Sequence, residues 1–553
     1  MFYFARMEFN LADLFEIVAD EVPDRLALVA GPARRTYREL DERANRVAHH
    51  LLAAGVGPGD HVAVQAWNRA EWLEVELGIF KARAAVVNVN YRYVAGELAY
   101  LLENSDAVAV ITERAFAPLL LEARERAPAL RHVVALDDGS RDAEPGTALA
   151  RLDAVGYEEA LGGVSGERDF GARSADDPYL LYTGGTTGVP KGVVWRAEDI
   201  FFAALGGGGF GQPPITRPEE LAGRVSATPT VGVVNAPMMH GGGQWVTFIA
   251  FYGGNTVVLN CDRHYDGDAV LRLVEREHAS SIMVVGDAMA RPLADALAAP
   301  GSRYDLSALA AIGSGGAILS PAVKEELRAR LPGALVTDSF GASETGAAGT
   351  VLDFEDPAAG PRFTISDWVT VLDDEGRRVE PGSGQVGRLA RRGHIPLAYY
   401  KDPEQTAATF VTDADGVRWV VPGDYATIEP DGTLNLLGRG SVCINTGGEK
   451  VYPEEVEAAL KAHPDVFDAV VVGIPDPRLG EQVAAIVRPR DPARPSLAEL
   501  QAFCRARLAG YKVPRRLELT DDIPRTPVGK PDYRSARRLA ERAPATPEPA
   551  PTA

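Results

Sequence analysis

Apolar and polar residues follow two periodicities along roughly the first 380 residues. A capping-box pattern at Thr36 and Glu39 is followed by apolar residues at helical spacing as far as Leu51. A second helix is predicted at 71–83. Short apolar runs predict strands at 61–66, 84–89, 107–112, 132–136, 179–182, 281–285 and 334–337. Strands that alternate with helices in this way predict an α/β fold with largely parallel sheets.

The pattern changes after about residue 380. Short β segments at 387–390 and 416–421 lie among Gly and Pro and predict a β-rich subdomain. Beyond it, a smaller α+β unit is predicted, with helices at 453–462 and 496–509 and strands at 468–474 and 482–488. We therefore expect a large N-terminal domain over 1–439, a hinge at 440–441, a small C-terminal domain over 442–540 and a disordered Pro/Ala-rich tail over 541–553.

Composition narrows the class of protein. The chain has 553 residues, 46% hydrophobic and 24% charged, which excludes a wholly disordered chain. No apolar run reaches the ~18 residues of a membrane span, and the first residues lack the apolar core of a signal peptide. The net charge of −20 disfavours nucleic acid and anionic lipid as partners. Three widely spaced cysteines favour a reducing cytoplasm, and the sequence permits a homodimer.

The strongest chemical motif is the segment Tyr182–Gly192, Tyr-Thr-Gly-Gly-Thr-Thr-Gly-Val-Pro-Lys-Gly, which follows a predicted strand. Its glycines free the backbone to wrap a phosphate chain with inward N–H groups, and Lys191 adds a cation. Pro190 precedes the lysine and Gly-Lys-Ser/Thr is missing, so this is not a Walker A loop. The structural alternative is a Gly/Thr loop that only joins a strand to a helix.

Two further motifs also have the composition of a nucleotide site. In the segment 338–345, Phe340 is suited to stack on a purine and Glu344 to hold Mg²⁺, although a solvated glutamate is the simpler interpretation of Glu344 alone. Asp424 is suited to accept hydrogen bonds from a ribose diol, and Arg439 to donate a pair of them. Each of these two residues, taken alone, is an ordinary turn residue.

The C-terminal part carries two more motifs. The segment 447–455 begins with paired glycines that permit a close backbone approach, and Pro453 is expected at the first helical position. Lys530 follows a glycine turn, where a lysine is normally solvated surface.

The order and residue types of these five motifs resemble the adenylate-forming superfamily of acyl-CoA synthetases, peptide-synthetase adenylation domains and luciferases, over about residues 10–540. The segments 437–450, 286–292 and 194–196 are most similar to actinobacterial fatty-acyl- and steroid-acyl-CoA synthetases. The resemblance implies that a carboxylate attacks the α-phosphorus of ATP to give an acyl-adenylate and pyrophosphate. A thiol then displaces AMP. ATP, Mg²⁺ and coenzyme A are the implied cofactor and co-substrates.

The resemblance also implies roles for individual residues. Lys530, Glu344, Thr186 and His240 are expected to be catalytic, with Thr186 and Glu344 at Mg²⁺ and Lys530 between the carboxylate and the α-phosphate. The expected ATP- and AMP-binding residues are Thr183, Gly184, Gly185, Thr186, Thr187, Gly188, Lys191, Gly315, Gly316, Ala317, Asp338, Ser339, Phe340, Gly341, Ser343, Asp424, Arg439 and Lys530.

The same resemblance places the acid and the thiol. The acyl pocket is expected at His240, Gly241, Gly242, Trp245 and Gly313, where the glycine run leaves room for a bulky apolar acid. The segment 235–239 contains no acid to bind an α-ammonium, so an amino-acid substrate is not expected. After adenylation the small, mobile domain is expected to rotate about Ser441. This rotation would bring Gly447, Gly448, Glu449 and Lys450 to the coenzyme A thiol.

Three functions are compatible with this resemblance. The first is an acyl-CoA synthetase for a hydrophobic fatty, aryl or steroid side-chain acid. The second is an acyl-AMP ligase that loads a carrier protein supplied in trans. The third, a non-catalytic nucleotide-binding protein, is disfavoured because the expected site residues are all present.

Overall fold

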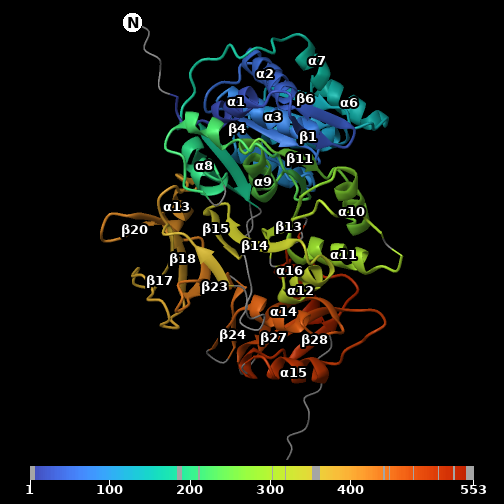
Figure 1. Ribbon diagram of the computed structural model, residues 1–553, viewed down its shortest axis with the longest axis vertical. Coiled ribbons are helices and arrows are strands. Elements are labelled where there is room, and N and C mark those ends of the chain that lie inside the picture. Colours follow the sequence, from blue (N-terminus) through green and yellow to red (C-terminus); the bar gives the residue numbers. More distant parts are fainter. Residues whose placement is uncertain are drawn as a thin grey trace, which may run out of the picture.

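The computed structural model describes residues 7–183, 190–209, 212–301, 303–317, 319–351, 362–439, 442–446, 449–476, 479–508, 510–526 and 530–542. In Figure 1 the N-terminal part of the chain, in blue and green, lies at the top and the C-terminal part, in orange and red, at the bottom. The β-rich region lies at the left between them.

A parallel sheet forms the first part of the large domain. Its strands follow the order β4 (Ala85–Asn88), β3 (His61–Gln65), β5 (Ala109–Glu113), β6 (His132–Leu136) and β7 (Val155–Gly156). The helices of this part are α2 (Tyr37–Ala53), α3 (Ala70–Lys81), α4 (Ala95–Asn104), α5 (Ala117–Ala123), α6 (Ala143–Arg151) and α7 (Tyr157–Gly162). The predicted capping box is confirmed, because Thr36 and Glu39 bond reciprocally at the start of α2.

A second sheet continues the large domain. Its order is β2 (Ala33–Thr36), β1 (Leu26–Ala30), β11 (Thr256–Leu259), β10 (Val231–Val234), β12 (Ser281–Val284), β13 (Ala311–Gly315) and β14 (Leu335–Ala342), parallel from β1 to β14. The associated helices are α1 (Leu11–Glu21), α8 (Ala197–Ala204), α9 (Gly241–Tyr252), α10 (Gly267–Arg276), α11 (Gly286–Ala298) and α12 (Pro321–Arg330).

The sheet extends into the β-rich region beyond β14. The order continues through β15 (Gly346–Val351), β16 (Arg362–Ile365), β23 (Leu434–Arg439), β22 (Asp424–Ile428), β18 (Gly387–Arg391), β21 (Arg418–Val420) and β20 (Phe410–Thr412), with β17 (Val369–Leu372) beside β18. The prediction that a strand ends at Thr337 is wrong. β15 pairs antiparallel with the next residues, so β14 runs on through the second motif to Ala342.

The small domain has the predicted α+β composition. Its sheet follows the order β25 (Glu449–Val451), β24 (Ile444–Thr446), β27 (Gly480–Pro489) and β26 (Val466–Asp476), with β28 (Arg516–Leu519) beside β27. Its helices are α14 (Pro453–Lys461), α15 (Leu497–Arg505) and α16 (Tyr533–Arg542). The helix predicted at 496–509 is shorter, because Ser496 is its N-cap and the α-helix ends at Arg505. Most of the predicted tail, from residue 543 onward, lies outside the described residues.

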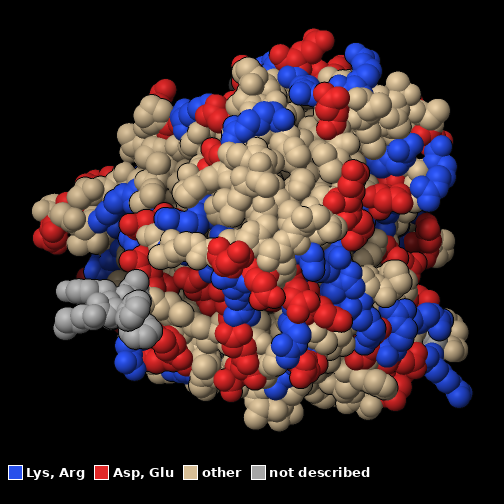
Figure 2. Space-filling model, turned by 90° about the horizontal axis from the view of Figure 1, so that it is seen from above, with Lys and Arg blue, Asp and Glu red and all other residues tan. Residues whose placement is uncertain are grey.

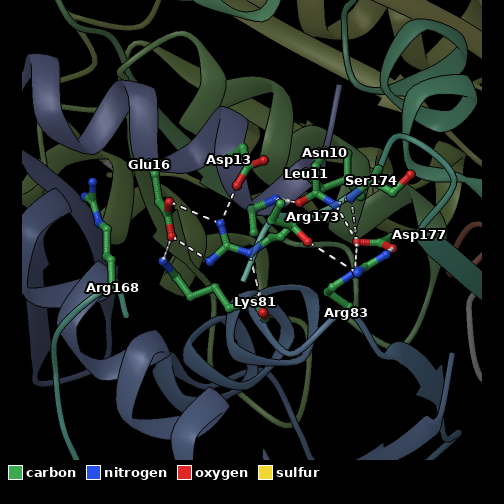
Figure 3. Close-up of polar contacts among 12 residues, drawn as sticks. Asn10, Leu11, Asp13, Glu16, Lys81, Arg83, Arg168, Arg173, Ser174 and Asp177 are labelled. Carbon is green, nitrogen blue, oxygen red and sulfur yellow. Dashed lines mark hydrogen bonds and ion pairs between the residues drawn. The ribbon is translucent and has the colours of Figure 1, made fainter. Parts of the chain in front are cut away.

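Buried charges tie the start of the chain to the large domain. The Lys81 side chain is fully buried and bonds to Glu16 and, at 2.8 Å, to Asp41. Figure 3 shows Arg173 reaching the same Glu16 and also Asp13. We call Lys81, Glu16, Asp41 and Arg173 the N-terminal charge cluster. It joins α1, α2, α3 and the segment before β8 (Pro178–Thr183) through paired charges, as buried charges require.

Acidic and basic side chains are interspersed over the face of the molecule that Figure 2 shows, so this face does not have charges of one sign only. Among the described residues, no helix combines the length and the apolar composition that a membrane span requires.

Candidate active site

The predicted phosphate loop joins two antiparallel strands, β8 and β9 (Lys191–Arg196). The alternative of a strand-to-helix loop is therefore wrong. Thr183, the last residue of β8, lies opposite Lys191, the first residue of β9. The loop residues between them that were expected to bind phosphate, Gly184, Gly185, Thr186, Thr187 and Gly188, lie outside the described residues. Their two anchors are thus held in a fixed register.

Lys191 and Glu344 converge on one tyrosine. Tyr399 lies on β19 (Ala398–Tyr399), which pairs with β9 opposite Val193. Its hydroxyl donates a hydrogen bond to Glu344 Oε1 at 2.8 Å, and the Lys191 ammonium lies 5.6 Å from its ring centroid. The Lys191 ammonium also lies 2.9 Å from Gln405 Oε1. The structure therefore brings the first and second motifs together.

Tyr399 is not part of any motif that the sequence predicts for this site. Its position depends on the pairing of β19 with β9, which are separated by about two hundred residues. No local pattern signals such a pairing, because the strand itself is only two residues long.

Asn88 fixes the base of the phosphate loop to the segment before His240. Its buried amide donates to the carbonyl oxygens of Tyr182, at 2.9 Å, and of Met239, at 2.7 Å, and its Oδ1 accepts the N–H of Tyr182. These three bonds hold β8 and the start of α9 at one end of β4. Asn88 is a second residue that the motif analysis missed.

His240 lies at the N-terminus of α9, where it is the N-cap residue. Its Nε2 is buried and has no hydrogen-bond partner within the described residues. Burial, and then the positive charges of Lys530 and Arg92, lower the pKa of His240 to about 3. The imidazole is therefore neutral at physiological pH.

The lowered pKa of His240 depends in part on Lys530. This exposed lysine belongs to the small domain, and its charge acts on a histidine of the large domain. Its carbonyl oxygen accepts a hydrogen bond from the Thr526 N–H at 2.7 Å. The charge of one predicted catalytic residue thus acts on another that lies 290 positions away in the sequence.

The expected adenine-binding segments are adjacent in the structure. The register pairs Gly315 of β13 with Ser339 of β14, and Gly316 follows with a positive φ of 81°. Phe340 packs edge-on against Phe363, with ring centroids 4.6 Å apart. The two segments that carry Gly315, Gly316, Ala317, Ser339, Phe340 and Gly341 therefore lie side by side.

Asp338 and Ser343 have local partners inside the protein. The Asp338 carboxyl is buried, which raises its pKa to about 7 against the opposing effect of Lys324. Only the backbone of Asp338 is therefore suited to an external ligand. The Ser343 carbonyl oxygen accepts a 2.9 Å hydrogen bond from the Trp195 indole, which fixes this segment to β9.

The expected ribose residues are cross-strand neighbours. Asp424 begins β22 and is paired in register with Arg439, the last residue of β23. A Cβ at Gly438 would lie 2.2 Å from a Glu454 carboxylate oxygen, and its φ of 113° also favours glycine. Glycine at this position therefore permits the first turn of α14, in the small domain, to approach β23.

The expected thioester segment is described only in part. Glu449 and Lys450 lie on β25, opposite Thr446 and Asn445 of β24. Gly447, Gly448 and the expected hinge residue Ser441 lie outside the described residues.

The structure corrects the expectation about the glycines of the acyl pocket. A Cβ at Gly241 would lie 2.8 Å from Leu181, and one at Gly243 would lie 2.6 Å from the Pro237 carbonyl oxygen. Glycine at these two positions permits close packing of α9, because Leu181 and the Pro237 backbone take the space of a side chain. Of the three, Gly242 alone has no neighbour within 4 Å of a Cβ among the described residues.

Trp245 lies one turn further along α9. Its indole N–H donates to the Tyr179 hydroxyl at 3.1 Å, and that hydroxyl donates to Gln244 at 2.6 Å. Gly313, on β13, has only the Thr337 hydroxyl oxygen near a Cβ, at 3.6 Å, among the described residues. The wall beside His240 is thus aromatic, with its polar atoms paired.

The described residues contain no group of three or more His, Cys, Asp or Glu side chains with the geometry of a metal site. Of the two residues expected at Mg²⁺, Glu344 lies within the described residues and Thr186 lies outside them. Glu344 is 9% exposed and lies beside the anchors of the phosphate loop. A single carboxylate fits a cation that takes its other ligands from nucleotide phosphates and water.

This arrangement defines a nucleotide-dependent ligase class, and comparison with known proteins agrees. Residues 15–400 match the AMP-binding enzyme family, and residues 455–530 match the AMP-binding enzyme C-terminal domain. The chain belongs to the AMP-binding enzyme family, within its acyl-CoA synthetases.

Full-length relatives give a finer comparison. The chain is 50% identical, over 98% of both sequences, to the medium/long-chain-fatty-acid–CoA/3-oxocholest-4-en-26-oate–CoA ligase of Mycolicibacterium smegmatis. It is 47% identical, over 96% of both, to the 3-oxocholest-4-en-26-oate–CoA ligase of Rhodococcus rhodochrous. Among solved structures, ATP-bound MatB from Rhodopseudomonas palustris is 25% identical with a TM-score of 0.80, covering 96% of this chain and 99% of its own.

Proposed function

We propose that this acyl-CoA synthetase converts a hydrophobic carboxylic acid, ATP and coenzyme A into an acyl-CoA, AMP and pyrophosphate. The observation that carries the proposal is the meeting of Lys191 and Glu344 at Tyr399, beside the anchors of the phosphate loop. A cation and a carboxylate placed together in this way are suited to the phosphate chain of a nucleotide and its divalent cation.

The first half-reaction joins the acid to AMP. One carboxylate oxygen of the acid attacks the α-phosphorus, the bond to the bridging oxygen breaks, and pyrophosphate leaves with the electron pair. Lys530 is placed to neutralise the oxygens that approach each other. A preorganised donor of this kind contributes about 10²–10³ in rate.

His240 acts as a neutral hydrogen-bonding group. Its buried Nε2 lacks a partner within the described residues, so it is available to the incoming acid. A pKa of about 3 keeps a second positive charge away from Lys530. His240 therefore orients the carboxylate without competing for it electrostatically.

Lys191 and Glu344 serve the pyrophosphate end of ATP. Lys191 is expected to contact the β- and γ-phosphates together with the residues from Thr183 to Gly188. We propose that Glu344 and Thr186 hold Mg²⁺, which neutralises charge on the transferring phosphates. The hydrogen bond from Tyr399 orients the Glu344 carboxylate for this role.

The second half-reaction requires another arrangement. Once the adenylate has formed, the Lys530 ammonium has no further bond to promote, and the thiol needs access to the acyl carbon. We propose that the small domain rotates about Ser441 and brings Gly447, Gly448, Glu449 and Lys450 to the pantetheine chain. The sulfur then forms the thioester bond as AMP departs.

The acid is expected to be a medium- or long-chain fatty acid or a steroid side-chain acid. Full-length relatives at 47–50% identity are named for such acids. The aromatic wall at Trp245 and the open position at Gly242 suit an apolar chain. Coenzyme A is favoured over a carrier protein as the acceptor because these relatives are named CoA ligases.

The test is AMP formation from ATP and Mg²⁺, with and without coenzyme A, across acetate, fatty, aryl and steroid side-chain acids. Turnover that depends on coenzyme A for fatty or steroid acids is the expected result. Pyrophosphate release without acyl-CoA would instead favour carrier loading, and inactivity with every acid would reject the proposal.

A further inference from the structure

The domain interface contains a buried ion pair that the expected chemistry leaves unused. Asp287 stands at the start of α11 in the large domain, and Lys461 ends α14 in the small domain. The Lys461 ammonium lies 3.4 Å from Asp287 Oδ2, and the two side chains are only 6% and 7% exposed. Burial of both partners makes this contact much less screened than a surface pair.

The same ammonium is bound within its own domain. It lies 3.5 Å from Asp468 Oδ1 on β26, and the second oxygen of Asp468 pairs with Arg525 at 2.5 Å. Burial alone would lower the pKa of Lys461, but Asp287 and Asp468 outweigh burial and raise it. Lys461 is therefore a stable cation between two domains.

Arg525 connects this cluster to the catalytic lysine. A β-bridge pairs Arg525 with Pro531, and the Thr526 N–H donates to the Lys530 carbonyl oxygen. The polar contacts therefore connect Asp287 of the large domain, through Lys461, Asp468 and Arg525, to the backbone around Lys530.

Both ends of the interdomain pair have other partners in their own domains. Asp287 Oδ1 accepts the Ser320 N–H at 2.8 Å within the large domain, and Lys461 retains Asp468 within the small one. Separation of the domains therefore leaves neither charge without a partner. This limits the large cost that normally accompanies the loss of one member of a buried pair.

We propose that Asp287 is a positioning residue for acyl-adenylate formation. Its ion pair with Lys461 holds the small domain in the arrangement that the structure describes, and the pair breaks when the thioester arrangement forms. This inference rests on the proposed function and adds a residue that favours one half-reaction over the other.

The test separates the two half-reactions in the full-length enzyme. Asp287→Asn retains the side-chain volume and the oxygen that accepts the Ser320 N–H, but removes the charge. Pyrophosphate release measures adenylation, and acyl-CoA formation from supplied acyl-adenylate measures the second step. We expect adenylation to fall about ten-fold, within the usual range of coupling between sites, while the second step stays within about two-fold or accelerates.

Two controls make the result specific. Asp137→Asn removes an exposed carboxylate, 71% accessible, from an ion pair inside the large domain and should change neither step. Lys461→Gln and the variant with both substitutions complete a double-mutant cycle. We expect the second substitution to reduce adenylation little beyond the first.

The outcomes distinguish this inference from the proposed function. Unchanged adenylation in Asp287→Asn, or an equal loss of both steps, would overturn the positioning role while wild-type turnover stands. A wild-type enzyme that forms no adenylate would instead reject the proposed function itself.

Discussion

Two buried lysines of this protein have similar partners but different tasks. Lys81 contacts Glu16 and Asp41, and all three belong to the large domain. Lys461 contacts Asp468 in its own domain and Asp287 in the other, at 3.5 and 3.4 Å. Lys81 is fully buried, and its 2.8 Å contact with Asp41 is shorter than either contact of Lys461.

The two lysines differ in whether their ion pairs persist when the domains separate. In the N-terminal charge cluster, both carboxylates have further arginine partners in the large domain, so the network is closed on itself. At Lys461, one of the two contacts crosses between domains, and each partner retains a contact when this ion pair is lost. Similar ion pairs therefore stabilise the N-terminal charge cluster permanently and, in our proposal, hold the two domains together for one half-reaction only.

The largest expected effect is on the N-terminal charge cluster. Lys81→Met keeps most of the side-chain volume but leaves Asp41 and Glu16 without their central cation. We expect a loss of about 3–5 kcal/mol in the free energy of unfolding, the cost of breaking a buried ion pair. Urea unfolding measures it. A loss below about 1 kcal/mol would show that the arginines alone hold the cluster.

The second-largest expected effect is the loss of adenylation when Lys530 is replaced. Lys530→Ala should reduce adenylation by about 10²–10³ because the cation between the reacting anions is removed. Acyl-CoA formation from supplied acyl-adenylate should persist. Rapid-quench assays of each half-reaction measure this, and an equal loss of both would contradict the role of Lys530.

A third prediction tests a buried carboxyl group. Glu76 lies on α3 with Lys81, and its carboxyl is buried beside the Trp72 indole. Burial raises the pKa of Glu76 from 4.5 to about 8, so the folded chain keeps a proton that the unfolded chain releases.

The sign of the pH dependence follows from that shift. The stability contributed by protonated Glu76 is complete below about pH 4.5 and is lost as pH rises to about 8. The neutral Glu76→Gln variant should escape this loss, which amounts to about 1.4 kcal/mol per pH unit within that window. Urea unfolding at several pH values compares the two proteins, and parallel pH profiles would contradict a raised pKa.

The smallest expected effect is at an exposed pair. Asp137 and Arg141 lie on the surface, with side chains 71% and 78% accessible. Asp137→Asn should change the free energy of unfolding by less than about 0.5 kcal/mol, because solvent screens such charges. A larger change in thermal unfolding would show that exposure is a poor guide to the strength of these pairs.

Local sequence patterns predicted much of the architecture. The capping box at Thr36, the helix that begins at Pro453 and the parallel strands of the large domain are all confirmed. The strand β14 ran further than predicted, since its partner β15 supplies hydrogen bonds that no local pattern records.

The site was predicted unevenly for the same reason. The family resemblance selected His240 and Lys530, and the charge of Lys530 is one of the causes that lower the pKa of His240. Tyr399 and Asn88 were not predicted, because their importance arises from contacts with strands distant in the sequence. Asp287 was not predicted either, because its partner Lys461 belongs to the other domain.

The residue chemistry and the local elements follow from the sequence, because helix caps, hydrophobic periodicity and glycine-rich turns depend on neighbours a few positions away. Three features follow only from the tertiary structure. They are the glycines beside His240 that have no room for a side chain, the tyrosine that orients Glu344, and the aspartate that pairs with a lysine of the small domain. These depend on distances between residues far apart in the chain, which only packing and strand pairing fix.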